Sequence, residues 1–208
     1  LLLFQYRAAA LAGLATQIFW GLIRMMIFTA FYQSTTAAMP MSISETINYI
    51  WLGQALLLLL PWWGDREIVE LIRKGGVAYE LVRPVDLYWM WFGRSIAQRI
   101  APVLMRATPM FILAGLFFKL QAPVNFVAAL AFILSIVAAA ILSTVIVLLS
   151  NISLFWTISG EGMTRLMPGI AWFLSGIVIP LPFFPEWLQP LFSILPFRGI
   201  IDIPFRLY

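Results

Sequence analysis

A chain of 208 residues suits one domain, and its composition is that of a membrane protein, with 62% hydrophobic residues, 11% charged residues and a mean hydropathy of +0.96. A soluble domain usually carries about 25% charged residues, so lipid must act as the solvent for most of this surface. The sequence contains no histidine and no cysteine, which removes the commonest general base and the commonest metal ligands. We therefore expect no catalytic residue, no metal site and no cofactor in this chain.

Five stretches are apolar enough to cross a hydrocarbon core of about 30 Å, which takes about 20 residues as a helix. In chain order, we expect these spans at residues 8–31, 46–63, 101–118, 125–158 and 163–180. The fourth stretch is longer than a bilayer needs, so it tilts, projects beyond the membrane or breaks near Ser150. The sequence thus predicts an all-α polytopic membrane protein with a single transmembrane domain over residues 1–208.

Lysine and arginine set the orientation, because short cytoplasmic loops retain them. One side of the predicted spans holds Arg7, Arg66, Arg73, Lys74, Arg83, Arg94, Arg99 and Arg165. The other side holds Lys119, Arg198 and Arg206. We therefore predict a cytoplasmic amino terminus. The pI near 9.8 reflects this bias and does not indicate a nucleic-acid partner. Five spans place Tyr208 outside, and a sixth span beyond it would fit the abrupt ending.

Nine of the 22 charged residues fall between Asp65 and Asp86, on the predicted cytoplasmic side. Asp65 can cap a short helix that has acidic residues in its first turns and basic residues in its last turn. The acidic residues are Glu67 and Glu70, and the basic ones are Arg73 and Lys74. This order complements the helix dipole.

The same short helix is amphipathic, because Ile68, Leu71 and Ile72 share one face by their spacing. Gly75 and Gly76 end it. At about two and a half turns it is too short to be stable alone in water, so it needs a surface to lie on. That surface is either the lipid headgroups, beneath an ordinary solvated loop, or a partner protein. The mixed charge favours a protein over anionic lipid.

The last segment, residues 181–208, is aromatic and rich in proline, and is too broken for a straight span. Prolines free backbone groups, which within a membrane must be buried in protein or face a watery cavity. The segment is therefore either a set of re-entrant helices or an interfacial loop anchored by Trp187 and phenylalanines among the headgroups.

Four polar side chains interrupt the predicted spans. Arg24 and Arg106 either extend their guanidinium groups toward the headgroups or line a pathway, since a charge at this depth is costly. Arg99 and Arg106 share nearly one helical face and could belong to an amphipathic entry helix in the interface. Gln17 and Gln54 either form hydrogen bonds between helices or contact a substrate.

Several motifs near the carboxyl end occur together in a known family. F-L-S-G at residues 173–176 and Pro180 are followed by P-E-W-L at 185–188 and L-P-F at 195–197. This order resembles the signature of type-2 ABC export permeases. D-R-E-I-V-E-L-I-R-K-G-G at residues 65–76 is similar to the cytoplasmic segment between the second and third spans of such permeases, especially bacterial drug-efflux-like ones.

The resemblance implies the permease subunit of an ATP-driven exporter in a bacterial cytoplasmic membrane. Such a subunit has six spans, pairs with a second, identical or homologous permease and is driven by a separate cytoplasmic ATPase dimer, where ATP and magnesium bind. This sequence departs from the family in one respect, because the sixth span is missing from it. The family assigns residues 157–165 to a second ATPase contact and residues 182–205 to outer re-entrant helices.

Particular residues take roles from the same resemblance. The ATPase-coupling segment, residues 64–87, would act through Asp65, Arg66, Glu67, Ile68, Glu70, Leu71, Arg73 and Lys74, with Glu161 at the second contact. The substrate pathway would include Gln17, Arg24, Phe173 and Pro180.

The sequence also bears on what would drive transport. The phosphate-binding pattern G-x-x-x-x-G-K-[ST] does not occur, so ATP must be hydrolysed by another chain. The alternative is a channel or an ion-coupled transporter that works without an ATPase, although Arg24 and Arg106 are the only ionisable candidates within the spans. An intramembrane enzyme lacks the necessary residues. The substrate stays open, although aromatic, apolar spans suit an amphipathic or hydrophobic molecule.

Overall fold

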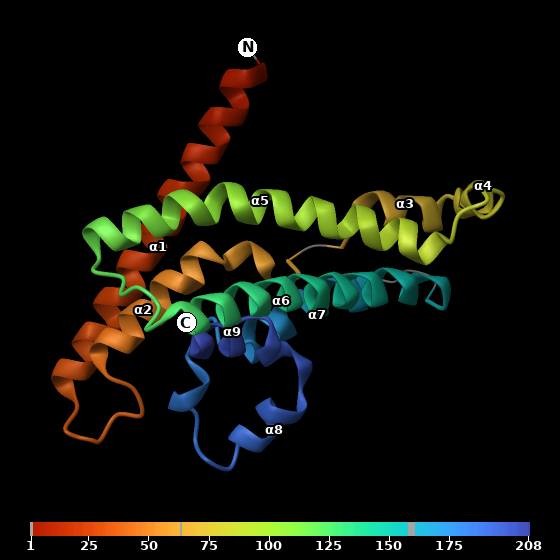
Figure 1. Cartoon of the computed structure of the whole chain (residues 1–208). Coiled ribbons are helices and arrows are strands. Elements are labelled where there is room, and N and C mark those ends of the chain that lie inside the picture. Colours follow the sequence, from red (N-terminus) through yellow and green to blue (C-terminus); the bar gives the residue numbers. More distant parts are fainter. Residues whose placement is uncertain (1, 63, 158–160) are drawn as a thin grey trace.

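The computed structural model describes the chain except residues 1, 63 and 158–160, and the side chains of residues 2–10 and 161. Every regular element in the described part is helical (Figure 1). The α-helices are α1 (Leu2–Ser34), α2 (Ile43–Ala55), α3 (Arg66–Arg73), α4 (Val77–Leu81), α5 (Leu87–Phe117), α6 (Phe126–Ile152), α7 (Glu161–Leu174), α8 (Gln189–Ile194) and α9 (Asp202–Leu207). Short 3₁₀ helices are η1 (Leu57–Leu59), η2 (Ser153–Phe155), η3 (Leu181–Phe183) and η4 (Pro196–Gly199).

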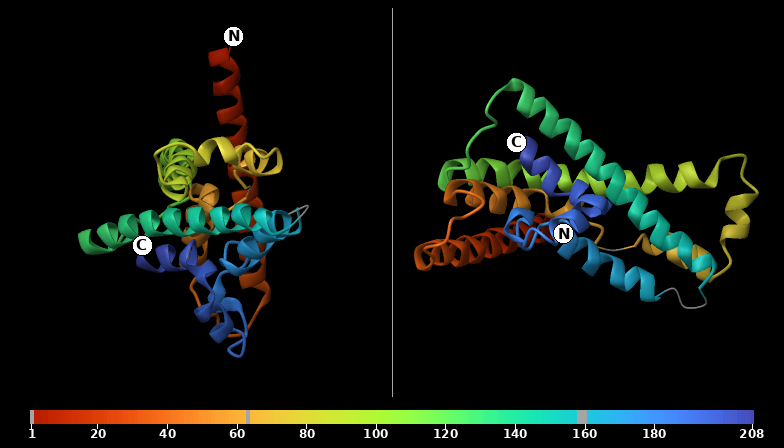
Figure 2. Two further views of the ribbon diagram at one scale, coloured as in Figure 1. Left: turned by 90° about the vertical axis from the view of Figure 1, so that its right-hand side faces the viewer. Right: turned by 90° about the horizontal axis from the view of Figure 1, so that it is seen from below.

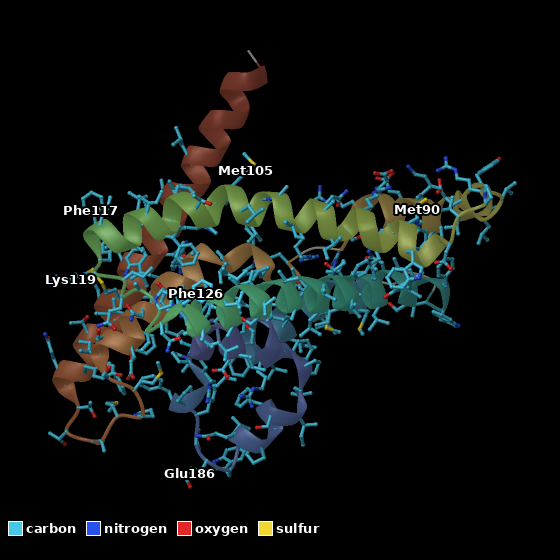
Figure 3. The ribbon with its side chains drawn as sticks, in the orientation of Figure 1. Met90, Met105, Phe117, Lys119, Phe126 and Glu186 are labelled. Atoms are coloured by element: carbon cyan, nitrogen blue, oxygen red, sulfur yellow. The ribbon has the colours of Figure 1, made fainter. Side chains whose placement is uncertain are left out.

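Three helical stretches among the described residues are long and apolar enough to cross a membrane: Leu11–Ser34, Leu87–Phe117 and Phe126–Phe155. The second is α5, and the third comprises α6 and η2. Helices α5 and α6 pack against each other at an angle and are joined by a turn at one end of the molecule, while α1 crosses them (Figures 1 and 2). Lys119 marks that end, and Met90 lies toward the opposite end, beside α3 and α4 (Figure 3). The predicted all-α class is confirmed, and two of the five predicted spans are shorter than expected.

The second predicted span is not one helix to residue 63. Helix α2 has 13 residues, and the leucine run that follows forms a turn and η1. Pro61 prevents helical structure from continuing beyond η1, because the residue before a proline avoids the helical region, and Leu60 is accordingly extended (φ −63°, ψ 145°). The buried leucines pack within the main core, which holds this irregular stretch inside the protein. The predicted end of this span, residue 63, lies outside the described residues.

The fifth predicted span ends six residues early. Helix α7 has 14 residues and stops at Leu174. Gly176 then takes φ +87°, a left-handed conformation that only glycine adopts without strain. Glycine is also required sterically here, because a Cβ on Gly176 would lie 2.8 Å from the Tyr49 hydroxyl. The F-L-S-G motif is therefore the point at which this helix breaks.

The third predicted span is longer than expected. Asp86 caps α5 by accepting a hydrogen bond from the Trp89 backbone N–H at 3.0 Å. The aromatic stretch at residues 88–92 therefore belongs to the same 31-residue helix as Arg99 and Arg106. Arg99 turns inward and donates to the Leu60 carbonyl and the Ser143 hydroxyl. The guanidinium of Arg106 lies against Gly13 of α1. The prediction of a separate entry helix lying in the interface is therefore wrong.

The fourth predicted span agrees more closely with the structure. Asn125 caps α6 by accepting from the Ala128 N–H at 2.8 Å, and the helix changes to 3₁₀ geometry at Ser153, close to the predicted break. The predicted end at residue 158 lies outside the described residues.

The carboxyl-terminal segment forms four short helices, η3, α8, η4 and α9, on the face of α6 turned away from α5 (Figures 1 and 2). Phe132 of α6 meets the Tyr208 ring at 4.8 Å. The buried carboxylate of Asp202 pairs with Arg206 at 2.9 Å and with Arg198 at 3.5 Å. The segment is broken as the prolines predicted. That these helices are re-entrant stays a prediction.

Candidate functional site: the α3–α4 segment and the cavity beside α1

Asp65 starts the charged helix α3. Its carboxylate accepts hydrogen bonds from the backbone N–H groups of Glu67 and Ile68, at 3.1 and 3.3 Å. An aspartate in this position satisfies donors that have no partner within the helix. The helix ends where Gly75 adopts φ +72°. The helix predicted at this place, its cap and its end are confirmed.

The apolar face of α3 packs against this chain's own helices. Ile68 is completely buried and forms a small core with Val77, Trp91 of α5 and Leu148 of α6. Leu71 and Ile72 are half-buried against the same core. The surface that the amphipathic pattern requires is therefore supplied by α5 and α6. Ile68 is fully occupied inside the protein, which leaves the charged side of α3 facing outward.

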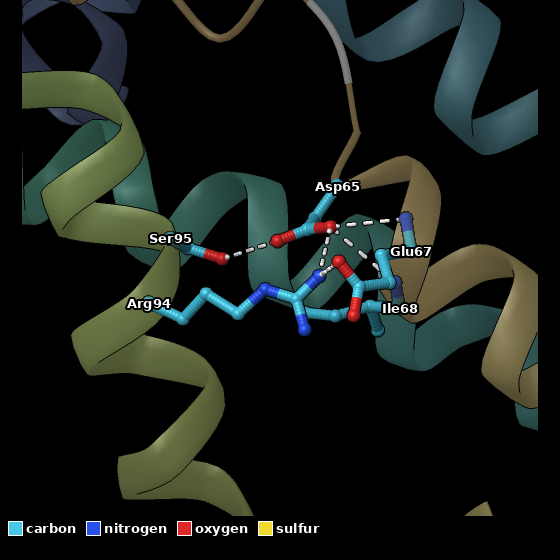
Figure 4. Close-up of polar contacts among 5 residues, drawn as sticks. All are labelled: Asp65, Glu67, Ile68, Arg94 and Ser95. Carbon is cyan, nitrogen blue, oxygen red and sulfur yellow. Dashed lines mark hydrogen bonds and ion pairs between the residues drawn. The ribbon is translucent and has the colours of Figure 1, made fainter.

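A polar cluster fixes α3 to α5 (Figure 4). Arg94 of α5 forms ion pairs with Glu67 and with Asp65, the latter at 3.5 Å. Ser95, the next residue, donates to the second carboxylate oxygen of Asp65 at 3.3 Å. Asp65 is buried, and a buried carboxylate needs such partners. The same side chain thus caps α3 and ties it to α5, so that the two helices are held as one unit.

The remaining predicted coupling residues lie on the outer side of α3. Arg66, Glu70, Arg73 and Lys74 are exposed. Lys74 donates to the Glu70 carboxylate at 2.8 Å, and this hydrogen bond and the lysine charge lower the pKa of Glu70. Exposed pairs of this kind add little stability.

The second predicted contact, residues 157–165, is only partly described. Residues 158–160 lie outside the described residues, as does the side chain of Glu161, whose backbone begins α7.

The segment around α4 carries an exposed apolar surface that was not predicted. Tyr79 is 82% exposed and Val82 is 83% exposed, and Leu81 and Val85 are exposed beside them. This surface lies at the far tip of the molecule, beyond α3 (Figure 1). Exposed apolar clusters mark interaction sites on proteins. The available signal was the run V-A-Y-E-L-V at residues 77–82, which places apolar residues within a charged stretch.

A second candidate site is a cavity of about 790 Å³ beside α1. It lies between one face of α1 and the ends of the two broken helices, α2 and α7. Its lining is mainly aromatic and aliphatic: Thr16, Gln17, Trp20, Ile23, Arg24, Ile27, Phe28, Phe31, Gln54, Leu57, Trp62, Trp172, Ile177, Val178, Ile179 and Phe183.

The structure brings Gln17 and Arg24 together on this cavity. Arg24 donates to the backbone carbonyls of Ile177 and Val178, the second at 2.9 Å. These carbonyls are free because α7 has already ended. Gln17 is 3% exposed, and neither its amide nitrogen nor its oxygen has a hydrogen-bond partner in the described part of the chain. Helix-to-helix hydrogen bonding of Gln17 is therefore not observed.

The other two predicted pathway residues lie beside the cavity and do not line it. Phe173 packs against Phe184, with ring centroids 5.9 Å apart, and Pro180 is buried. Their neighbours Trp172 and Ile179 line the cavity in their place. Among the described residues, no group of three or more acidic, histidine or cysteine side chains is placed to hold a metal ion.

Comparison with known proteins gives the family. Residues 18–208 match the model of the family described as "ABC-2 family transporter protein". The chain therefore belongs to the ABC-2 transporter family, and its identification as a type-2 ABC permease is confirmed. No curated protein and no solved structure matches the chain. Members of this family are transmembrane transport components and are not themselves catalytic, which agrees with the apolar helices described above.

Proposed function

We propose that this chain is the membrane-spanning permease subunit of an ATP-driven exporter in a bacterial cytoplasmic membrane. It would work with a second permease subunit and with a separate ATPase dimer that binds ATP and magnesium. The α3–α4 segment would face the cytoplasm and receive the ATPase. The observation that carries this proposal is that α3 is fixed to α5 by its buried side while its charged side and the apolar tip of α4 face outward.

The charge distribution supports the orientation. The basic residues Arg66, Arg73, Lys74 and Arg83 gather at the end that carries α3 and α4 (Figure 1). Cytoplasmic loops retain lysine and arginine. Lys119 lies at the opposite end (Figure 3). This distribution supports a cytoplasmic position for α3 and α4.

The geometry supports a mechanical role for this segment. A force on α3 passes to α5 through the Asp65–Arg94 ion pair and to α6 through the Ile68–Leu148 contact. Helix α5 is continuous over 31 residues, which is about 46 Å at 1.5 Å per residue. A displacement at the ATPase end would therefore reach the opposite end of the membrane span. The moving parts include α2, whose buried face packs against α5.

Co-purification with a candidate ATPase, sought among the neighbouring reading frames, tests the proposal. Tyr79→Asp with Val82→Asp places two charges on the exposed tip of α4 without touching the buried core. We expect this double variant to lose at least about 90% of the bound ATPase, since charges in an apolar contact are strongly unfavourable.

Val124→Asp is the matched control, because Val124 is 90% exposed in the turn at the opposite end. It should bind the ATPase as the unmodified chain does. Full binding by the double variant, or transport by the chain without any ATPase, would contradict the proposal. The second result would favour a channel or an ion-coupled transporter.

A further inference from the structure

The cavity beside α1 has the size and lining of a small-molecule site. Its volume of about 790 Å³ lies within the range of about 300–1,000 Å³ usual for such sites. Trp20, Phe28, Phe31 and Trp172 contribute aromatic surface to it. Surface of this kind favours an apolar body over a hydrated ion.

One positive charge in this cavity has no counter-charge. Among the described residues that line the cavity, Arg24 is the only charged one. Its bonds to the carbonyls of Ile177 and Val178 use the Nη2 nitrogen alone. A guanidinium has five N–H donors, and no described residue accepts from Nη1 or Nε. An arginine stays charged at all physiological pH values, so an anionic group would complete its contacts.

Two amides extend the polar surface along the same side. Gln17 precedes Arg24 by seven residues, which places both on one face of α1 about 10 Å apart. Both polar atoms of Gln17, and the Oε1 atom of Gln54, are buried without a partner in the described part of the chain. Buried polar atoms are normally hydrogen-bonded. Gln17 and Gln54 line the cavity, so their amides are unpaired donors and acceptors directly beneath its surface.

Arg24 also lies deep within the predicted membrane. It stands 13 residues after Leu11 and 10 residues before Ser34, the bounds of the first candidate span, or about 20 and 15 Å along the helix. A lipid that belongs to the bilayer keeps its headgroup at the interface, about 15 Å from the midplane. An acidic group beside Arg24 therefore belongs to a molecule that has left the interface, as a transported molecule must.

We propose that this cavity binds an amphipathic anion: an apolar body against the aromatic surface and one acidic group, a carboxylate or a phosphate, against Arg24. Gln17 is the next polar contact for that group along α1. This inference rests on the proposed function for its role in transport, since it names the class of substrate. The binding itself requires neither ATP nor an ATPase.

Fluorescence binding to the purified full-length chain in phosphatidylcholine nanodiscs tests the inference. The probe is 11-(dansylamino)undecanoic acid, and its methylamide is the matched neutral probe. Trp20, Trp62 and Trp172 line the cavity, so bound dansyl should be excited by energy transfer from tryptophan. We expect the acid to bind about tenfold or more tightly than the amide, a difference that one ion pair can supply.

Arg24→Gln should abolish this preference by weakening the binding of the acid probe and not that of the amide. Arg24→Lys should restore part of the preference. Arg106→Gln is the control, since Arg106 lies against Gly13 and outside the cavity. Binding of the neutral probe reports that the cavity is intact in each variant. Equal affinity of the two probes for the unmodified chain would overturn the inference. Equal weakening of the binding of both probes by Arg24→Gln would also overturn it, because Arg24 would then only stabilise the fold.

Two further measurements identify the source of the anion and distinguish failure of this inference from failure of the proposed function. Displacement of the acid by added phosphatidylglycerol would identify a lipid as the natural source, and persistence would identify a free amphiphile. Both results keep the anionic class. Loss of ATPase association with retained acid binding would refute the proposed function alone. Retained ATPase association without acid preference would refute this inference alone.

Discussion

Two helices end inside the protein, and an arginine from a neighbouring helix meets the end of each. After α2, Arg99 donates to the Leu60 carbonyl at 3.2 Å, and after α7, Arg24 donates to the carbonyls of Ile177 and Val178. Within a membrane, backbone groups freed in this way need a partner in the protein. Each arginine is therefore explained first by the helix end that it completes.

The surroundings of the two arginines differ. Arg99 also donates to the buried hydroxyl of Ser143 at 3.1 Å, and the cavity beside it is only about 210 Å³ and has Asp65 in its lining. Arg24 lines about 790 Å³ of mainly apolar space without a described acidic residue. Each arginine uses a single nitrogen for these bonds, Nη1 in Arg99 and Nη2 in Arg24, so the two differ in the space around them and not in their number of unused donors. The contrast separates an arginine that stabilises the fold from one that is open to a ligand.

The largest effect expected is on stability at the first helix end. Arg99→Leu leaves the Leu60 carbonyl and the Ser143 hydroxyl without their donor, and hydrogen bonds to a charged group contribute about 1.5–3 kcal/mol each. We expect a loss of about 4 kcal/mol in the free energy of unfolding. Arg24→Leu should lose about 2 kcal/mol, because water entering the larger cavity can replace part of its bonding. Unfolding by sodium dodecyl sulfate in mixed micelles measures both, and equal losses would remove the distinction.

The turn after α7 gives the next largest effect. Gly176→Ala combines a left-handed backbone, which costs about 1–2 kcal/mol, with a Cβ 2.8 Å from the Tyr49 hydroxyl and 3.0 Å from Leu181. We expect a loss of about 3 kcal/mol in the same unfolding assay. Gly75→Ala is the matched control, since it has φ +72° but open space around the position. A loss of about 1 kcal/mol is expected there. Similar losses at the two glycines would show that the close contact has no energetic weight.

The attachment of α3 should respond more weakly. Arg94→Gln removes the ion pairs to Asp65 and Glu67, and partly exposed pairs contribute about 0.2–1 kcal/mol. Hydrogen exchange of the α3 amides should become up to about fivefold faster. Exchange at the ends of α2 and α7 should not change. Lys74→Gln, which removes only the exposed pair with Glu70, should leave exchange unchanged apart from the last turn. Unchanged exchange in Arg94→Gln would mean that the core around Ile68 and the Ser95–Asp65 hydrogen bond hold α3 without the ion pairs.

The smallest effect concerns pH at the start of α2. The Ser42 backbone N–H donates to the Glu45 carboxylate, and this hydrogen bond lowers the pKa of Glu45 below 4.5. A lowered pKa in the folded state means that the stabilisation is complete above pH 4.5 and is lost as pH falls through the lowered value. Below pH 4.5 the amides of the first turn should exchange faster. Glu45→Gln keeps the capping geometry and should remove this pH dependence, whereas an unaltered pH profile would exclude Glu45 as its source.

Much of this fold follows from local sequence rules. The cap at Asp65 and the helix end at Gly75 each depend on a few neighbouring residues, and the structure agrees with both. A break near Ser150 was one of three alternatives for the fourth span, and α6 ends close to it, at Ile152. The shortened second and fifth spans were harder to predict. Hydropathy does not distinguish a leucine run in a helix from one packed in an irregular turn, although Pro61 carried the signal.

The sites depended on tertiary contacts that no spacing rule reveals. Arg24 and Ile177 are 153 residues apart in the chain, and their contact arises only because α7 breaks beside α1. The burial of Ile68 against Trp91 and Leu148 likewise required three elements to meet. The exposure of Tyr79 had only a weak signal, an apolar run inside a charged stretch, because apolar residues are usually buried.

Single-cysteine crosslinking in intact membranes tests most directly whether the α3–α4 segment is the cytoplasmic seat of an ATPase. The chain has no cysteine of its own, so Tyr79→Cys and Val124→Cys each introduce one thiol, at opposite ends. We predict that Tyr79→Cys crosslinks to the partner ATPase and resists an impermeant maleimide in whole cells. Val124→Cys should react with the maleimide and should not crosslink to the ATPase. Labelling of Tyr79→Cys from outside, or crosslinking of the ATPase through Val124→Cys, would contradict the account.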